Sequence, residues 1–241
     1  MGRFFEARKA TIMARNKSVS KQFTRVVREI MSAVKDGGED PDTNPSLRRA
    51  IQNGRAVSMP RDTIENAIKR ALGADADDWA EAIYEGYAPH GVAVMVVTST
   101  NNPTRTAANV RHAFKKNGGN LGALGSVNFQ FNRMGVFRIK PEHVEDAEML
   151  ELEMIDHGLE EMGEGTDDNG DPIWVLRCAF ESFGTLQAGL EGSKIEVTST
   201  ALEHVPDNFM ELGDSEADDV MKMLGALEED DDVNHVFHNL A

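Results

Sequence analysis

The chain has a single cysteine, Cys178, among its 241 residues. One thiol cannot form a disulfide within the chain, and it cannot supply the several thiolates of a cysteine-rich zinc site. Long apolar runs are also missing: the longest, 92–97, falls far short of the roughly 20 residues that cross a bilayer as a helix. The N-terminus has no continuous apolar segment followed by a small-residue cleavage site. These absences predict a soluble cytoplasmic protein without a membrane partner.

A second absence concerns catalytic and metal-binding groups. His235 and His238 are three positions apart in a predicted strand, so the alternation of side chains sends them to opposite faces and they cannot easily share a metal ion. The carboxylates are dispersed or fall in runs such as 228–232, which are typical of solvated loops. No nucleophile, base and orienting group come together. The sequence therefore predicts no enzyme activity, no cofactor and no metal.

Positive charge is scarce overall but concentrated at one end. The chain holds 25 Lys and Arg against 41 Asp and Glu, a net charge of −16. Residues 1–72 hold 15 basic and 8 acidic side chains (+7), whereas residues 73–241 hold 10 and 33 (−23). Because partners meet local surfaces and not averages, we interpret the first segment as a polyanion-binding end on an acidic body.

The first section, residues 1–75, is predicted as a basic helical domain. Apolar residues recur at helical spacing at Phe23, Val27, Ile30 and Val34. Gly37 and Gly38 are expected to end this helix. Asn44 with Pro45 gives an N-cap and a first-turn proline for a second helix, and Pro60 begins a third.

The remaining chain is predicted as two domains, one inserted in the other. A central α/β domain takes residues 79–133 and 205–241, with a helix over 103–117 and a strand over 127–131. Residues 134–204 follow the β-α-β-β-α-β pattern of a ferredoxin-like fold. The predicted fold class is α+β: an N-terminal helical domain, a central α/β domain and an inserted, acidic ferredoxin-like domain.

The strongest candidate for function is a basic stripe on the first helix. If residues 20–36 form one helix, Lys21, Arg25 and Arg28 share a face roughly 200° from the apolar residues, so their charges are expected to point away from the core. The upstream cations expected to supplement this stripe are Arg8, Lys9, Arg15 and Lys17. Clustered Lys and Arg can replace phosphate counterions, as in nucleic-acid binders. A solvated helix face is the alternative interpretation.

A second group of cations follows Asn102 and Pro103. The predicted helix there carries Arg105, Arg111, Lys115 and Lys116. They are a candidate for a smaller, secondary contact surface, with a plain solvated face as the alternative. The glycine-rich loop 118–125 comes after this helix, whereas phosphate-binding loops lead from a strand into a helix N-terminus. We therefore interpret the loop as a structural turn that uses glycines at positive φ.

Several motifs resemble those of the YebC family. The motifs are Tyr84–Ala93, Asn102–Thr106, Gly118–Gly122 and Val236–Asn239, and they keep the family's order over nearly the whole chain. The resemblance implies three domains and control of gene expression through nucleic acid. Bacterial members are commonly described as probable transcriptional regulators, a mitochondrial relative is known as a translational activator of cytochrome oxidase, and bacterial members have been linked to the ribosome.

The sequence thus predicts a monomeric or weakly self-associating regulator of transcription or translation that binds DNA or RNA through its N-terminal domain. Phosphate contacts do not distinguish the two nucleic acids, and no aromatic stacking platform is visible. The alternative hypothesis is a protein-interaction adaptor whose acidic domains bind a basic partner such as ribosomal proteins. Residues 134–203 hold 17 acidic and 4 basic side chains, a composition that repels nucleic acid.

Overall fold

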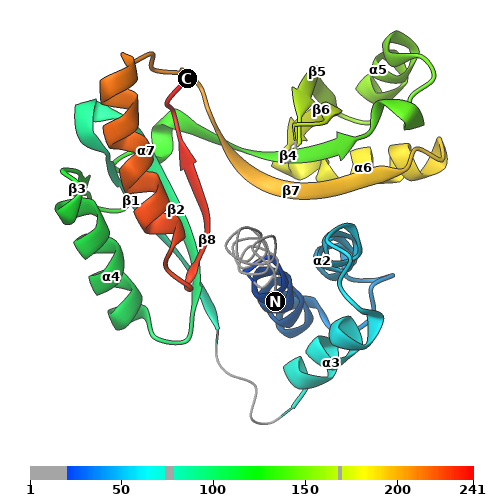
Figure 1. Cartoon of the computed structure of the whole chain (residues 1–241). Helices are drawn as coiled ribbons and strands as arrows, with labels where there is room; N and C mark the ends of the chain where they lie inside the picture. The colour runs from blue at the N-terminus through cyan, green and yellow to red at the C-terminus, as the bar shows by residue number, and fades with distance from the viewer. Residues whose placement is uncertain (1–20, 74–78, 168–169) are drawn as a thin grey trace, which may run out of the picture. The chain divides into compact units, whose positions relative to one another are not determined.

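The computed structural model describes residues 21–73, 79–167 and 170–241 (Figure 1). The chain separates into two compact units, residues 1–77 and 78–241, and each is described by itself. The second unit contains two four-stranded sheets. The predicted division of this unit into a central and an inserted domain stays a prediction. None of the helices within the described ranges is both long enough and apolar enough to cross a membrane.

The first unit is helical, as predicted. A helix over residues 21–37 is followed by α2 (Pro45–Ala56) and α3 (Arg61–Ala71). The Asn44 side chain accepts a hydrogen bond from the Leu47 N–H and donates to the Ala33 carbonyl, at 3.0 and 2.7 Å. The predicted N-cap is therefore confirmed, and the same amide also ties α2 to the first helix.

The helices of this unit pack closely at one glycine. A Cβ added at Gly54 of α2 would lie 3.2 Å from a Val26 methyl and 3.3 Å from the Ile64 side chain. Both neighbours are buried, with Ile30 and Leu47 fully excluded from solvent in the same unit. The missing side chain at Gly54 thus lets residues from the first helix and α3 reach the same point on α2.

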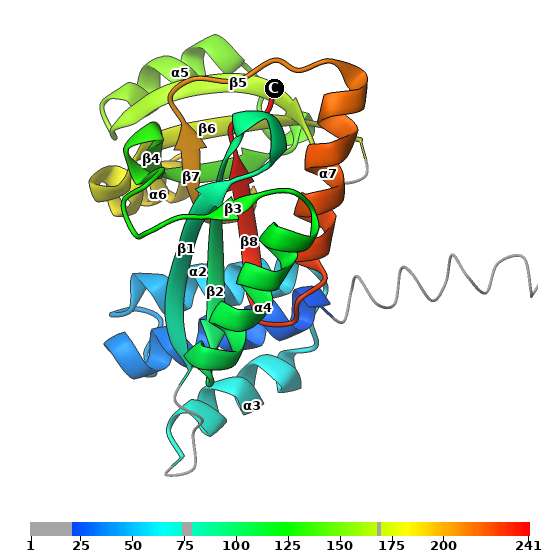
Figure 2. The ribbon, with the colours of Figure 1, turned by 90° about the vertical axis from the view of Figure 1, so that its left-hand side faces the viewer.

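The first sheet of the second unit has the order β3-β1-β2-β8, with every pair antiparallel. Its strands are β1 (Ala80–Tyr87), β2 (Ala93–Thr100), β3 (Asn120–Leu121) and β8 (Val233–His238). The helices α4 (Pro103–Lys116) and α7 (Asp214–Glu228) cover one face of it (Figures 1 and 2). Val94 and Val96 of β2 join that core, while Met95 packs on the other face against Val127 and Phe131. β2 is therefore buried on both sides.

The second sheet has the order β5-β6-β4-β7 and is also antiparallel throughout. Its elements along the chain are β4 (Phe131–Ile139), α5 (Ala147–Ile155), β5 (Leu159–Thr166), β6 (Pro172–Ala179), α6 (Phe183–Gly192) and β7 (Val197–Pro206). Phe137, Met154, Leu176 and Leu186 lie in its core. The β-α-β-β-α-β prediction is confirmed, because the first strand lies between the third and the fourth, as in ferredoxin-like folds.

The predicted strand over 127–131 is wrong. Residues Asn128–Gln130 form a short 3₁₀ turn, and β4 begins only at Phe131. The backbone N–H groups of Val127 and Asn128 donate to the buried carboxylate of Glu85, so they are not available for a ladder with another strand. Further 3₁₀ turns span Pro89–Gly91, Pro141–His143 and Phe180–Ser182.

Candidate nucleic-acid interface

The basic stripe of the first helix is less exposed than its sequence pattern predicts. Lys21 and Arg25 are half-buried, and Arg28 is buried with 8% of its surface exposed. Each of the three already has an interaction partner within the chain. The solvent exposure expected for Arg28 is therefore not found, and its role in nucleic-acid binding stays a prediction. Met31, one turn further along on that side of the helix, is only 4% exposed, so the helix is covered there as well as on its apolar face.

Four of the predicted contact residues lie outside the described residues: Arg8, Lys9, Arg15 and Lys17. Residues 1–20 hold five basic side chains and one acidic side chain, a net of +4 out of the +7 of residues 1–72. More than half of the positive charge that motivates the interface thus belongs to this segment. The role of its cations stays a prediction.

Other cations of the first unit lie at helix ends or in local contacts. Arg55 closes α2, Lys69 and Arg70 close α3, and all three are exposed. Positive side chains at these ends also offset the negative end of each helix dipole. Arg48 donates to the carbonyls of Pro41 and Asp42 at 3.1 and 2.9 Å, so its role is to hold the turn before α2.

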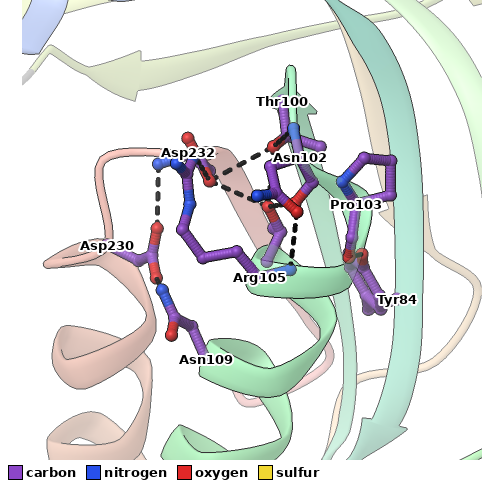
Figure 3. A network of polar contacts seen from close by, with 9 residues as sticks. Tyr84, Thr100, Asn102, Pro103, Arg105, Asn109, Asp230 and Asp232 are labelled. Atoms are coloured by element: carbon purple, nitrogen blue, oxygen red, sulfur yellow. Dashed lines mark hydrogen bonds and ion pairs between the residues drawn. The ribbon is translucent and has the colours of Figure 1, made fainter.

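The first residue of the predicted secondary surface, Arg105, is held in an internal ion pair at the start of α4 (Figure 3). Its Nη2 donates to Oδ2 of Asp232 at 2.7 Å, and the Asp232 side chain is only 5% exposed. Oγ1 of Thr106 and Oγ1 of Thr100 donate to the same oxygen at 2.8 and 3.3 Å. Asn102 caps the helix by accepting from the Arg105 N–H. Arg105 therefore has a structural role that its sequence pattern did not indicate.

The negative charge of Asp232 is stabilised by the neighbouring side chains. Burial alone would raise its pKa, but the hydrogen bonds from Arg105 and Thr106, and the positive charge of Arg105, hold the pKa below its ordinary value. Asp230 extends the network by accepting from Asn109 at 2.8 Å and from the Asp232 N–H at 2.9 Å. The turn between α7 and β8 is thereby fixed against the N-terminal half of α4.

The other three predicted cations of α4 are exposed on its last turns: Arg111, Lys115 and Lys116. Lys116 also lines a hollow of about 310 Å³ between α4 and α7, together with His112, Glu229 and Asp230. Because carboxylates share this hollow, its charge is mixed and does not favour a phosphate group. Arg111 and Lys115, one turn apart, are exposed and do not line this hollow.

The glycine-rich loop after α4 closes on a carboxylate of the chain. Glu85 of β1, 3% exposed, accepts from the N–H groups of Gly125, Val127 and Asn128 at 2.8, 2.8 and 2.9 Å. Burial raises its pKa, but these three hydrogen bonds outweigh burial and lower the pKa of Glu85. Gly118 and Gly125 have φ of 79° and 87°. The structural-turn interpretation is confirmed, since these glycines adopt positive φ and the loop N–H groups of Gly119 and Gly122 donate to backbone carbonyls.

Sequence reasoning missed two buried carboxylates within the described residues, Glu85 and Asp232. The available signal was an acid inside or beside a strand: Glu85 interrupts the run Ile83–Tyr87, and Asp232 directly precedes β8.

The only cysteine, Cys178, is buried, and burial raises the pKa of its thiol to about 11, which keeps it protonated at neutral pH. Across the described ranges, no three His, Cys, Asp or Glu side chains are grouped so that they could hold a metal ion.

Comparison with known proteins gives matches over both units. Residues 3–74 match the family model described as TACO1/YebC protein N-terminal domain, and residues 79–240 match the model described as TACO1/YebC second and third domain. Over the full length of both chains, this chain is 57% identical to a "Probable transcriptional regulatory protein" of Anaeromyxobacter dehalogenans. A "Probable transcriptional regulatory protein" of Myxococcus xanthus is 53% identical, again over the full length of both chains.

A solved structure is also similar. The crystal structure of a conserved hypothetical protein from Aquifex aeolicus superposes with a TM-score of 0.82 at 36% sequence identity. The match covers 92% of this chain and 90% of that one. The α+β fold with N-terminal helices and antiparallel sheets is thus shared with a protein of known structure.

Proposed function

The chain belongs to the TACO1/YebC family, and on that premise we propose that it is a nucleic-acid-binding regulator of gene expression that acts through its N-terminal unit. In this proposal the protein has no catalytic activity of its own. The names of its relatives support a role in transcription. Regulation of translation through RNA or the ribosome is the other setting that the YebC resemblance implies.

The observation that carries the proposal is the division of charge between residues 1–72 and the rest of the chain. A polyanion is attracted to residues 1–72, at +7, and repelled by residues 73–241, at −23. The interface is therefore assigned to Lys21 and Arg25 of the first helix, with Arg8, Lys9, Arg15 and Lys17 before it. Arg28 is assigned to the packing of the helix because it is buried.

The sheet unit is assigned at most a secondary contact. Arg105 is engaged by Asp232, and the glycine-rich loop by Glu85. Arg111 and Lys115 are the exposed cations that could add to phosphate binding there. Variants of this pair should change affinity less than variants of the first helix.

Binding to a labelled DNA duplex and to a labelled RNA of the same sequence tests the proposal, with the full chain and fluorescence anisotropy as readout. If about four phosphates are neutralised, affinity for the duplex should fall about 100-fold between about 50 and 200 mM salt. The Lys21→Glu/Arg25→Glu variant should lose binding to both nucleic acids. The matched control Lys140→Glu/Lys222→Glu makes the same change of charge at exposed positions of the second unit and should bind nearly as wild type.

A flat salt response, or equal loss in both variants, contradicts the proposed interface. Crosslinking in cells then identifies which nucleic acid is bound, by recovery of DNA, mRNA or rRNA with the protein.

A further inference from the structure

Helix α5 is apolar on two opposite sides. Leu150 and Met154 are buried in the core of the second sheet, at 5% and 0% exposure. Met149, Leu152 and Ile155 are 64%, 66% and 54% exposed. An amphipathic surface helix has one apolar face toward the core and a polar face toward water. In α5, by contrast, the outer side is apolar as well as the inner side.

The three exposed residues form one stripe. They are spaced i, i+3 and i+6, so they cover about 120° of the helix and about 9 Å along its axis. Single exposed apolar residues are ordinary, but three neighbours on one short helix make a contiguous patch. The helix lies beside β5 at one end of the second sheet (Figures 1 and 2).

Carboxylates border this stripe on both sides. By helical geometry, Glu148 and Glu151 lie toward one edge, and Glu153 and Asp156 toward the other. All four are exposed, and α5 contains no basic residue. Glu153 also accepts a hydrogen bond from Oγ of Ser193 at 2.6 Å, which holds this part of α5 against the end of α6. The outer side of α5 is thus an apolar strip between two acidic borders.

We propose that this strip, Met149, Leu152 and Ile155 with its four bordering carboxylates, is a docking surface for a basic amphipathic helix of a partner protein. Apolar side chains of such a helix cover the strip, while Lys and Arg on both flanks meet the carboxylates. Charge selects this occupant. Nucleic acid and anionic lipid are repelled by the acidic borders, and a second copy of α5 would set carboxylates against carboxylates. The flexible side chain of Met149 suits an adaptable contact.

This inference does not rest on nucleic-acid binding. The strip belongs to the second unit, and the proposed nucleic-acid interface belongs to the first. Either surface can therefore fail its test while the other passes.

The test measures binding of the full chain to a fluorescein-labelled amphipathic peptide of about 18 residues, with a leucine stripe flanked on both sides by lysines. The wild type should bind this probe, and should not bind a second probe in which glutamate replaces every lysine. Leu152→Gln/Ile155→Gln should weaken binding about 10-fold or more, because the leucine stripe then buries less apolar surface. The matched control Leu124→Gln/Met221→Gln changes apolar residues that are 83% and 55% exposed elsewhere in the second unit, and should bind as wild type.

A second pair of variants tests the acidic borders without touching the apolar strip. Glu148→Gln/Glu151→Gln should weaken binding and reduce its salt dependence, whereas Asp218→Asn/Glu229→Gln on and after α7 should do neither. No binding by the wild type, or equal weakening by α5 and control variants, overturns the proposal. Mass photometry of the unliganded chain adds a third outcome. If wild type self-associates and Leu152→Gln/Ile155→Gln does not, a second copy is the occupant and the proposal fails.

Discussion

Arg105 and Asp232 form an ion pair at 2.7 Å across 127 positions of the sequence. The pair joins the first turn of α4 to the residue that precedes β8, and Thr100 and Thr106 complete the surroundings of the carboxylate. Two segments at opposite ends of the second unit are thereby fixed by one buried carboxylate. The hydroxyl groups have this oxygen as their shared acceptor, so its removal affects several donors at once.

Asp232→Ala should lower the free energy of unfolding by about 2 kcal/mol, because it removes the ion-pair partner of Arg105 and the acceptor of the buried Thr100 hydroxyl. Urea unfolding followed by circular dichroism measures the change. Asp231→Ala is the control, since Asp231 is exposed and adjacent, and its effect should stay below about 0.5 kcal/mol. Equal effects of the two substitutions would mean that the network does not stabilise the fold.

Acidification should destabilise the chain through Glu85. Its pKa is lowered in the folded state from the ordinary value of 4.5. The unfolded chain therefore binds the proton more readily, so the contribution of Glu85 to stability is complete above about pH 5 and is lost as the pH falls through the folded pKa. Glu85→Gln should lower the melting temperature at pH 7 and flatten its decline below about pH 5.

The control for Glu85→Gln is Glu81→Gln, because Glu81 lies on the same strand and its side chain is exposed. This variant should keep both the melting temperature and its dependence on pH. If Glu85→Gln retains the wild-type slope, the carboxylate does not control the acid response.

Replacing glycine by alanine should have opposite effects on stability at two positions of the second unit. Gly125 has φ of 87°, whereas Gly225 lies inside α7 with open space around an added Cβ. Gly125→Ala should cost about 1 kcal/mol, because an L side chain is strained at that φ. Gly225→Ala should add up to about 1 kcal/mol through helix propensity. Thermal unfolding of both variants decides this, and a stabilised Gly125→Ala would show that the loop does not require a left-handed residue.

The elements predicted correctly are those that local sequence dictates. Asn44 and Asn102 each accept from a backbone N–H three residues ahead, so an N-cap can be predicted without knowing the tertiary structure. The order of strands and helices in the second sheet follows from alternating apolar patterns, and this was sufficient to identify the ferredoxin-like arrangement.

The features missed depend on contacts between distant segments. Glu85 is 40 to 43 positions from the N–H groups that it accepts. By default, a charged residue in a strand is predicted to face solvent. The N–H groups that donate to Glu85 come from a loop that reaches it only in the folded chain. Arg28 illustrates the same limit. Helical phasing from apolar residues describes one buried face and cannot indicate that the side of Arg28 and Met31 is covered too.

The burial of Arg28 separates stability from binding within one helix. Arg28→Gln should lower the free energy of unfolding by about 1–2 kcal/mol, since a buried arginine contributes the packing of its stem and Arg28 already has an interaction partner within the chain. Lys21→Gln should leave stability nearly unchanged and instead weaken nucleic-acid binding, with a salt slope smaller by about 0.9 for one lost phosphate contact. Urea midpoints and anisotropy titrations at several salt concentrations measure both properties on the same samples. An Arg28→Gln variant that keeps its unfolding midpoint but loses salt slope would place Arg28 among the phosphate contacts, contrary to its position in the fold.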